Sequence, residues 1–166
     1  MKHIIANHTC NAFLKPGEVI VTTGPILVST VLGSCVAITM YSSKKKIGAI
    51  CHAMLANVRG QAGNLLSVDS AVRYMYRKMK ECGCCGDLEI KIFGGAQLLG
   101  SNYGVGRKTV GEQNVMEAKH TISELGLQVS NADTGGSSGR KLFFSIMTGD
   151  VYLRKLKQTN DACGQG

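Results

Sequence analysis

Two residues that could carry out covalent chemistry lie in neighbouring apolar segments of the chain. Cys35 comes directly before the apolar run Val36–Tyr41, and His52 lies inside the run Ile47–Leu55. The thiolate is the nucleophilic form of cysteine, and a free thiol with a pKa of about 8.5 is only slightly ionised at neutral pH. An imidazole within reach of the thiol can accept its proton, so the two residues together predict an activated nucleophile.

The two apolar runs are the elements that must bring this pair together. Val36–Tyr41 and Ile47–Leu55 are separated only by the short basic segment Ser42–Lys46, which predicts an antiparallel hairpin. In such a hairpin Cys35 and His52 fall at roughly opposite positions on adjacent strands, where side chains can touch. The predicted hairpin therefore brings the thiol within reach of the imidazole.

The residues before the cysteine indicate where an oxyanion could bind. Gly33 has no Cβ, so backbone N–H groups around Ser34 and Cys35 can approach a substrate carbonyl and stabilise the negative charge that develops on it. Spacing alone leaves another interpretation open, because free cysteine is among the most buried residue types. In that interpretation Cys35 and His52 are ordinary core side chains without a catalytic role.

Several further motifs are spread over most of the chain in a distinctive order. They are Thr30-Val31-Leu32-Gly33-Ser34-Cys35-Val36-Ala37, Gly48-Ala49-Ile50-Cys51-His52-Ala53-Met54-Leu55, Phe93-Gly94-Gly95-Ala96, Gly111-Glu112-Gln113-Asn114-Val115, Asp133-Thr134-Gly135-Gly136 with Gly139-Arg140-Lys141, and Thr148-Gly149. In this order they resemble the motifs of the CheD family of chemoreceptor glutamine deamidases. The resemblance extends from about Pro16 to Leu156.

This resemblance implies a cysteine hydrolase that converts selected glutamines of methyl-accepting chemotaxis receptors to glutamates through a thioester intermediate. Cys35 would be the nucleophile and His52 the base, and no cofactor would be needed. The chemotaxis phosphatase CheC would be a second partner. Two alternatives stay open: a non-catalytic adaptor that binds receptors or CheC, and a receptor methylesterase, because amides and esters react through the same type of tetrahedral intermediate.

The resemblance also implies a hydroxyl residue, shortly before the cysteine, that orients the histidine ring. Ser29 stands at the expected spacing, and Thr30 stands one position nearer Cys35. Adjacent residues of a strand face opposite sides, and a two-residue step keeps the side, so a regular strand places Ser29 on the face of Cys35. The pattern therefore favours Ser29 as the partner of His52. A bulge at Gly33-Ser34 would favour Thr30 instead.

The length and periodicity of the chain predict one α+β domain over residues 1–166. Its core would span about 16–156, with a polar C-terminal tail at 157–166. We expect a layered fold with a mixed, mainly antiparallel sheet and two main helices. Besides the hairpin, strands are predicted over Glu18–Thr22, Ile26–Val31, Leu88–Phe93, Leu127–Asn131, Leu142–Met147 and Val151–Leu156, and helices from Val68 to a stop at Gly83 and over Glu112–Leu125.

The net charge of +8 would suit nucleic acid, an acidic membrane surface or an acidic protein partner, but few features indicate nucleic acid. Aromatic residues make up only 5% of the chain, there is no Trp, and the basic residues are not interleaved with rings that could stack on bases. A receptor surface rich in Glu would be a natural acidic partner. No run approaches the roughly 20 apolar residues of a membrane span, and Met1–Cys10 does not have the pattern of a signal peptide. We therefore expect a cytoplasmic protein without membrane insertion.

The seven cysteines are an odd number, which argues against a disulfide framework and predicts reduced thiols. Cys82, Cys84 and Cys85 form a cluster that could be considered for zinc. A closed zinc site needs four ligands, and no second pair of cysteines or histidines complements this cluster. The glycine-rich string Gly104–Thr109 does not match the phosphate-binding loop either, because Arg107 separates the glycine from the lysine. We therefore expect no metal.

Overall fold

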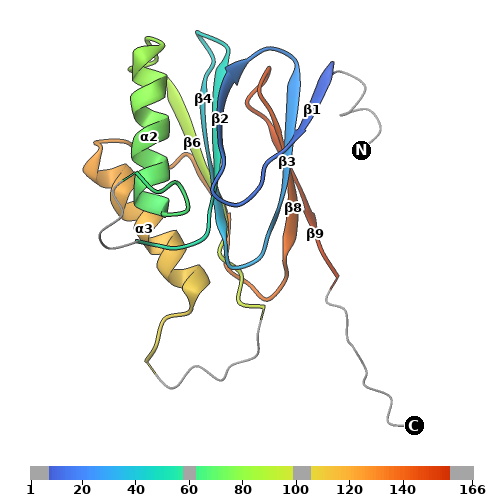
Figure 1. The fold of residues 1–166 in the computed structure, drawn as a ribbon, viewed down its shortest axis with the longest axis vertical. Coiled ribbons are helices and arrows are strands. Elements are labelled where there is room, and N and C mark those ends of the chain that lie inside the picture. The colour runs from blue at the N-terminus through green and yellow to red at the C-terminus, as the bar shows by residue number, and fades with distance from the viewer. Residues whose placement is uncertain (1–7, 58–62, 99–105, 158–166) are drawn as a thin grey trace.

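Two β-sheets and a pair of helices are stacked in three layers (Figure 1). The structure is a computed structural model that describes residues 8–57, 63–98 and 106–157. The outer sheet has the strand order β1 (Cys10–Phe13), β3 (Ile26–Leu32), β8 (Arg140–Ser145), β9 (Val151–Lys155), and the central sheet the order β2 (Val19–Thr23), β5 (Ile47–Ala53), β4 (Val36–Ser42), β6 (Leu88–Gly94), β7 (Asn131–Thr134). Helices α2 (Val68–Glu81) and α3 (Val110–Glu124) cover the face of the central sheet that points away from the outer sheet.

Both sheets are mixed and mainly antiparallel. Each contains one parallel pair, β1 with β3 in the outer sheet and β6 with β7 in the central sheet, and the other neighbours are antiparallel. The predicted α+β class, with mainly antiparallel strands and two main helices, is confirmed. The strands are divided between two sheets, because β4 and β5 are buried on both faces and each face needs its own covering layer.

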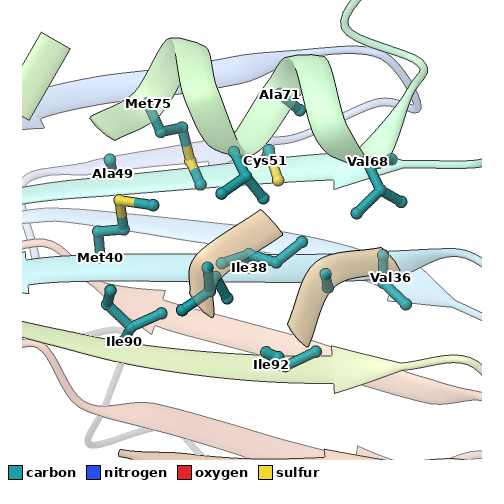
Figure 2. Packing of buried hydrophobic residues seen from close by; sticks show 14 of the residues in the cluster. Val36, Ile38, Met40, Ala49, Cys51, Val68, Ala71, Met75, Ile90 and Ile92 are labelled. Atoms are coloured by element: carbon teal, nitrogen blue, oxygen red, sulfur yellow. The ribbon is translucent and has the colours of Figure 1, made fainter. Parts of the chain in front are cut away.

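The central sheet separates two apolar cores. Alternate residues of a strand point to opposite faces, so Ile38 and Met40 of β4 pack toward α2, where Met75 is fully buried (Figure 2). Ala37 points the other way, into the core between the two sheets, together with Phe144 of β8. The second core holds the two sheets at a fixed separation, on which the site described below depends.

Local signals define the ends of the helices. Thr109 caps α3 by accepting a hydrogen bond from the backbone N–H of Glu112, and the Glu112 side chain accepts one from the Thr109 backbone in return. Helix α2 ends just before Gly83, which adopts a φ of 77° and lets the chain turn away. Both predicted helices are therefore confirmed, with small differences at their boundaries.

One predicted strand is wrong, and one observed strand was not predicted. The strand expected over Leu127–Asn131 is instead β7, which begins only at Asn131 and ends at Thr134. Leu127 and Val129 pack against the core under the helices, so their alternation reflects burial and not strand pairing. Strand β1 is short and exposed, and it lacks the alternating pattern that would have predicted it.

Some expectations concern residues outside the described ranges. The string Gly104–Thr109 lies partly outside them, and so does nearly all of the predicted tail at 157–166. Within the described ranges, the structure contains no helix long and apolar enough to cross a membrane.

Candidate active site

A histidine from the central sheet meets a threonine from the outer sheet. His52 lies in β5 and Thr30 in β3, and both side chains point into the space between the sheets, where they are buried. The Thr30 hydroxyl Oγ1 lies 2.8 Å from His52 Nδ1, and it donates a hydrogen bond of 2.7 Å to the backbone carbonyl of Leu14. The sheet packing therefore fixes the orientation of the imidazole ring.

The Leu14 carbonyl determines which ring nitrogen of His52 carries the proton. A hydroxyl has one hydrogen, and a carbonyl oxygen can only accept, so Thr30 must use its hydrogen for Leu14. The contact with Nδ1 then requires Nδ1–H to donate to Oγ1, which leaves Nε2 of His52 unprotonated. Nε2 is buried and has no hydrogen-bond partner among the described residues. His52 is thus held in the tautomer that a general base needs.

The expectation that Ser29 meets His52 is corrected by this geometry. Ser29 is paired with Phe13 of β1 and Phe143 of β8, and its side chain faces the side of the outer sheet opposite to that of Thr30. The parity argument assumed one regular strand from Ser29 to the cysteine. In fact β3 ends at Leu32, and the chain crosses to the central sheet before β4 begins.

Cys35 lies on this crossing, directly before β4. In the ladder between β4 and β5, Ala37 is the residue opposite His52, so Cys35 is displaced from direct opposition by two residues. Because Cys35 lies in the bend before β4, its side chain is placed by packing and not by the strand ladder. Cys35 packs, partly buried, against the core between the sheets, into which His52 also points. The predicted hairpin is confirmed, but Cys35 does not lie directly opposite His52 as expected, because Ala37 takes that position.

Burial has opposite effects on the ionisation of the two residues. It raises the pKa of the Cys35 thiol, an effect that the cysteine's own backbone N–H partly offsets by stabilising the thiolate. Burial lowers the pKa of His52, and the Leu14 carbonyl partly offsets this by stabilising the protonated ring. At neutral pH both shifts favour the uncharged forms, a thiol at Cys35 and a neutral imidazole at His52.

The loop Gly33–Cys35 is bound to the end of β6. The backbone N–H of Gly95 donates to the Cys35 carbonyl, and that of Ala96 donates to the Gly33 carbonyl, both at 2.8 Å. Gly94 has a φ of 103°, and a Cβ at this position would lie 2.2 Å from the Cys35 carbonyl oxygen. Only glycine allows so close an approach, which explains why β6 ends with a glycine at position 94.

A cleft of about 340 Å³ opens beside the loop Gly33–Cys35. Its lining residues come from the loop, from the segment after β6 and from the start of α3: Ser34, Ala96, Gln97, Leu98, Thr109, Val110 and Gly111. Ser34, predicted to contribute to an oxyanion hole, thus lies at the wall of a cavity that could admit a side chain. Gly33 faces Leu98, since a Cβ on Gly33 would lie 2.6 Å from a Leu98 methyl carbon.

One buried residue next to the loop was not singled out from the sequence. Asn114 of α3 is fully buried, and its side-chain amide donates hydrogen bonds of 2.9 Å to the carbonyls of Ser34 and Met54. A signal was available, because Asn114 lies four residues before the buried Ala118 and therefore on the same face of the helix. A polar side chain on the buried face of a helix requires a partner.

The motif that joins Asp133 to Arg140 has a structural role. Arg140 is buried, and its guanidinium donates to the Asp133 carboxylate and to the carbonyls of Asp133 and Gly135. Since Asp133 lies in β7 and Arg140 in β8, this contact links the two sheets.

The described ranges contain no group of three or more His, Cys, Asp or Glu residues that could hold a metal ion. Cys84 is buried, whereas Cys82 and Cys85 are exposed.

The chain resembles known proteins over most of its length. It is 40% identical over 151 residues to Probable chemoreceptor glutamine deamidase CheD 2 of Geobacter sulfurreducens, an alignment that covers 90% of this chain and 92% of the relative. Relatives named Probable chemoreceptor glutamine deamidase CheD are 37% identical in Methanococcus maripaludis, covering 86% of this chain and 93% of the relative, and 36% identical in Pyrococcus abyssi, covering 84% and 88%.

Two other comparisons concern the family and the fold. A solved structure of the Bacillus licheniformis hypothetical protein YfiH superimposes with a TM-score of 0.49 at 10% identity, covering 72% of this chain and 51% of that one, which supports no conclusion. The family profile described as CheD chemotactic sensory transduction matches residues 54–155. With this profile over more than half of the chain and relatives aligned over nearly all of it, the chain belongs to the CheD family.

Proposed function

We propose that this protein is a cysteine hydrolase that deamidates glutamine side chains of chemoreceptors. The observation that carries the proposal is the oriented imidazole: Thr30 holds His52 with Nε2 unprotonated, and Cys35 packs against the core into which His52 points. The family relatives are named chemoreceptor glutamine deamidases, which identifies the substrate class that we propose. Cys35, His52 and Thr30 would form the catalytic group.

In the first half of the reaction, the Cys35 thiol proton moves to His52 Nε2 while the sulfur attacks the carboxamide carbon of a glutamine. The negative charge on the tetrahedral oxygen would be stabilised by backbone N–H groups around Ser34 and Cys35. His52 then returns the proton to the amide nitrogen, and the C–N bond breaks to release ammonia. The product of this half is a thioester between Cys35 and the substrate.

In the second half, water replaces ammonia. His52 Nε2 accepts a proton from a water molecule, whose oxygen attacks the thioester carbon. The C–S bond then breaks, the proton returns to the sulfur, and a glutamate side chain leaves the site. The cycle consumes one water molecule and regenerates the thiol and the neutral imidazole, so it needs no cofactor.

The rim of the cleft supports a protein substrate. Leu98 and Val110 line the cleft and are exposed, and Met54 and Leu55 are exposed just after the strand that carries His52. Exposed apolar side chains that gather around a site are typical of a surface that binds another protein. The net charge of +8 suits a partner with acidic side chains.

The described cysteines are all free, which suits a reducing compartment such as the cytoplasm. Binding to a CheC-type phosphatase stays a prediction of the family resemblance.

The proposal is tested by incubating the protein with purified chemoreceptors and following the mass of receptor peptides. Each deamidated glutamine gains the mass difference between a carboxamide and a carboxylic acid, and we expect this gain to require Cys35. The variant Cys35→Ala should bind the receptor without changing its mass. Receptors that bind but keep their mass with the unmodified protein would favour an adaptor, and activity only on methylated glutamates would favour an esterase.

A further inference from the structure

The side-chain amide of Asn114 connects the two halves of the candidate site. Its nitrogen donates to the carbonyl of Ser34, next to the nucleophile, and to the carbonyl of Met54, two residues after His52. Both acceptors are carbonyl oxygens, so both amide hydrogens are used and the amide cannot be flipped without placing its own oxygen against them. The orientation of Asn114 is therefore determined by its partners.

The bond to Ser34 fixes a peptide unit and not only a carbonyl group. The Ser34 carbonyl and the Cys35 N–H belong to the same peptide, which is planar and trans, so they point in opposite directions. With the carbonyl directed at Asn114 on α3, the Cys35 N–H points away from the helix. Among the described residues, no backbone carbonyl accepts a hydrogen bond from the Cys35 N–H.

We propose that Asn114 is a positioning residue that sets the Ser34–Cys35 peptide so that the Cys35 N–H serves as an oxyanion donor. The inference rests on the proposed deamidation and adds a residue to it. Asn114 does not touch the substrate in this proposal. It acts through the peptide, and its second bond, to Met54, keeps that peptide in register with the strand that carries His52.

The surroundings of the sulfur agree with this placement. The Cys35 N–H lies close enough to its own sulfur to stabilise the thiolate and lower the pKa of the thiol against the larger effect of burial. A donor that faces the nucleophilic sulfur also faces the carbonyl that the sulfur attacks, since the new C–S bond brings the developing oxyanion near the same atoms.

A simpler role for Asn114 would be to anchor α3 to the sheet. Thr121 offers a matched control, because it lies two turns further along α3, is also fully buried, and contacts Asp69 of α2 through its hydroxyl at 3.3 Å. The variants Asn114→Ala and Thr121→Val both remove a buried polar contact of the helix. Only Asn114→Ala removes a contact to the loop Gly33–Cys35.

The experiment measures kcat and KM for receptor deamidation, and the rate of Cys35 alkylation against pH, in the unmodified protein and both variants. We expect Asn114→Ala to lower kcat by at least about tenfold, toward the roughly hundredfold loss known for removal of one oxyanion donor, with KM little changed. The alkylation profile of Cys35 should shift to higher pH. Thr121→Val should change neither quantity, even where it lowers stability.

The outcomes separate the inference from the proposed function. If kcat per folded molecule and the alkylation profile are the same in Asn114→Ala and the unmodified protein, Asn114 is only an anchor and the inference is wrong. If the receptor is never deamidated but the alkylation profile still shifts, the proposed function fails while the positioning of the peptide stands. Should Asn114→Ala not fold, Asn114→Leu keeps the buried volume without the donors, and the same comparison is made with it.

Discussion

At the scale of single residues, the candidate site depends on a hydroxyl group that contacts the His52 ring. Two adjacent residues of β3, Ser29 and Thr30, carry a hydroxyl. Thr30 contacts His52, and Ser29 does not, because the inner face of β3 carries Thr30. The hydroxyl has a defined task, since it accepts from Nδ1 and passes its own hydrogen to Leu14. Any residue at this position that lacks an acceptor loses control of the ring.

The first prediction compares the two hydroxyl residues. We expect Thr30→Ala to slow deamidation by more than about tenfold, equivalent to about 1.4 kcal/mol of transition-state stabilisation, because the ring can then rotate or change tautomer. Ser29→Ala should have little effect, and Thr30→Ser should restore most of the activity. Steady-state kinetics on the three variants, with circular dichroism to confirm folding, provide the measurement. A larger defect in Ser29→Ala would contradict the geometry.

The second prediction concerns pH. Burial lowers the pKa of His52 below its ordinary value of 6.5, and the base must be neutral to accept the thiol proton. Deamidation should therefore persist as pH falls through 6.5 and decline only at lower pH, where the folded protein protonates His52. The pH profile of kcat/KM reports this value for the free enzyme. A decline centred above 6.5 would show that His52 is not the group that controls activity.

The same shift affects stability with a defined sign. Below 6.5 the unfolded chain binds a proton at His52 that the folded protein does not bind, so the free energy of unfolding decreases as pH falls through that range. His52→Gln should remove this part of the pH dependence, which urea denaturation at several pH values would show.

At the scale of elements, the loop Gly33–Cys35 depends on the end of β6. Gly94 combines a positive φ with contact to the Cys35 carbonyl, whereas Gly24 has a similar φ of 99° and nothing within 4 Å of the position of a Cβ. The two glycines therefore separate the cost of the backbone conformation from the cost of the contact. The loop should tolerate a change at Gly24 and not at Gly94.

The third prediction uses this contrast. Gly24→Ala should lower the free energy of unfolding by about 1–3 kcal/mol, the usual cost of a strained backbone conformation, and leave the activity of the folded protein unchanged. Gly94→Ala should cost more and also reduce kcat, because the new Cβ displaces the peptide that follows the nucleophile. Urea denaturation and deamidation kinetics test both. Equal effects of the two substitutions would argue against the proposed contact.

At the scale of the whole molecule, the site lies between two sheets, and the core between them sets its dimensions. Thr30 and His52 come from different sheets, so their contact requires the separation that residues such as Phe144 maintain. The core under the helices, which includes Met75, supports the central sheet from the other side. Damage to the two cores should therefore have different functional consequences.

The fourth prediction compares one fully buried residue from each core. Phe144→Ala should lower the free energy of unfolding by about 3–5 kcal/mol and Met75→Ala by about 2–5 kcal/mol, since both leave cavities. Only Phe144→Ala should also lower kcat per folded molecule, because the sheets can then approach and the hydroxyl of Thr30 can lose its place against His52. If both variants keep full specific activity, the site does not depend on the sheet separation.

The sequence alone was sufficient for features that depend on short stretches of chain. The hairpin of β4 and β5 and both helices follow from local periodicity, turns and caps, because neighbouring residues supply the interactions that stabilise them. The family resemblance identified Cys35 and His52 from their motifs.

The tertiary structure decided what depends on contacts between distant segments. Thr30 and not Ser29 contacts His52 because β3 ends at Leu32 and the chain then crosses to the other sheet. The alternation of residues along a single strand could not predict this crossing. The role of Asn114 depends on α3 packing against the loop before Cys35, 80 residues earlier in the chain. Such pairings are selected by the burial of whole layers against one another, and that burial is a property of the folded molecule that no short segment contains.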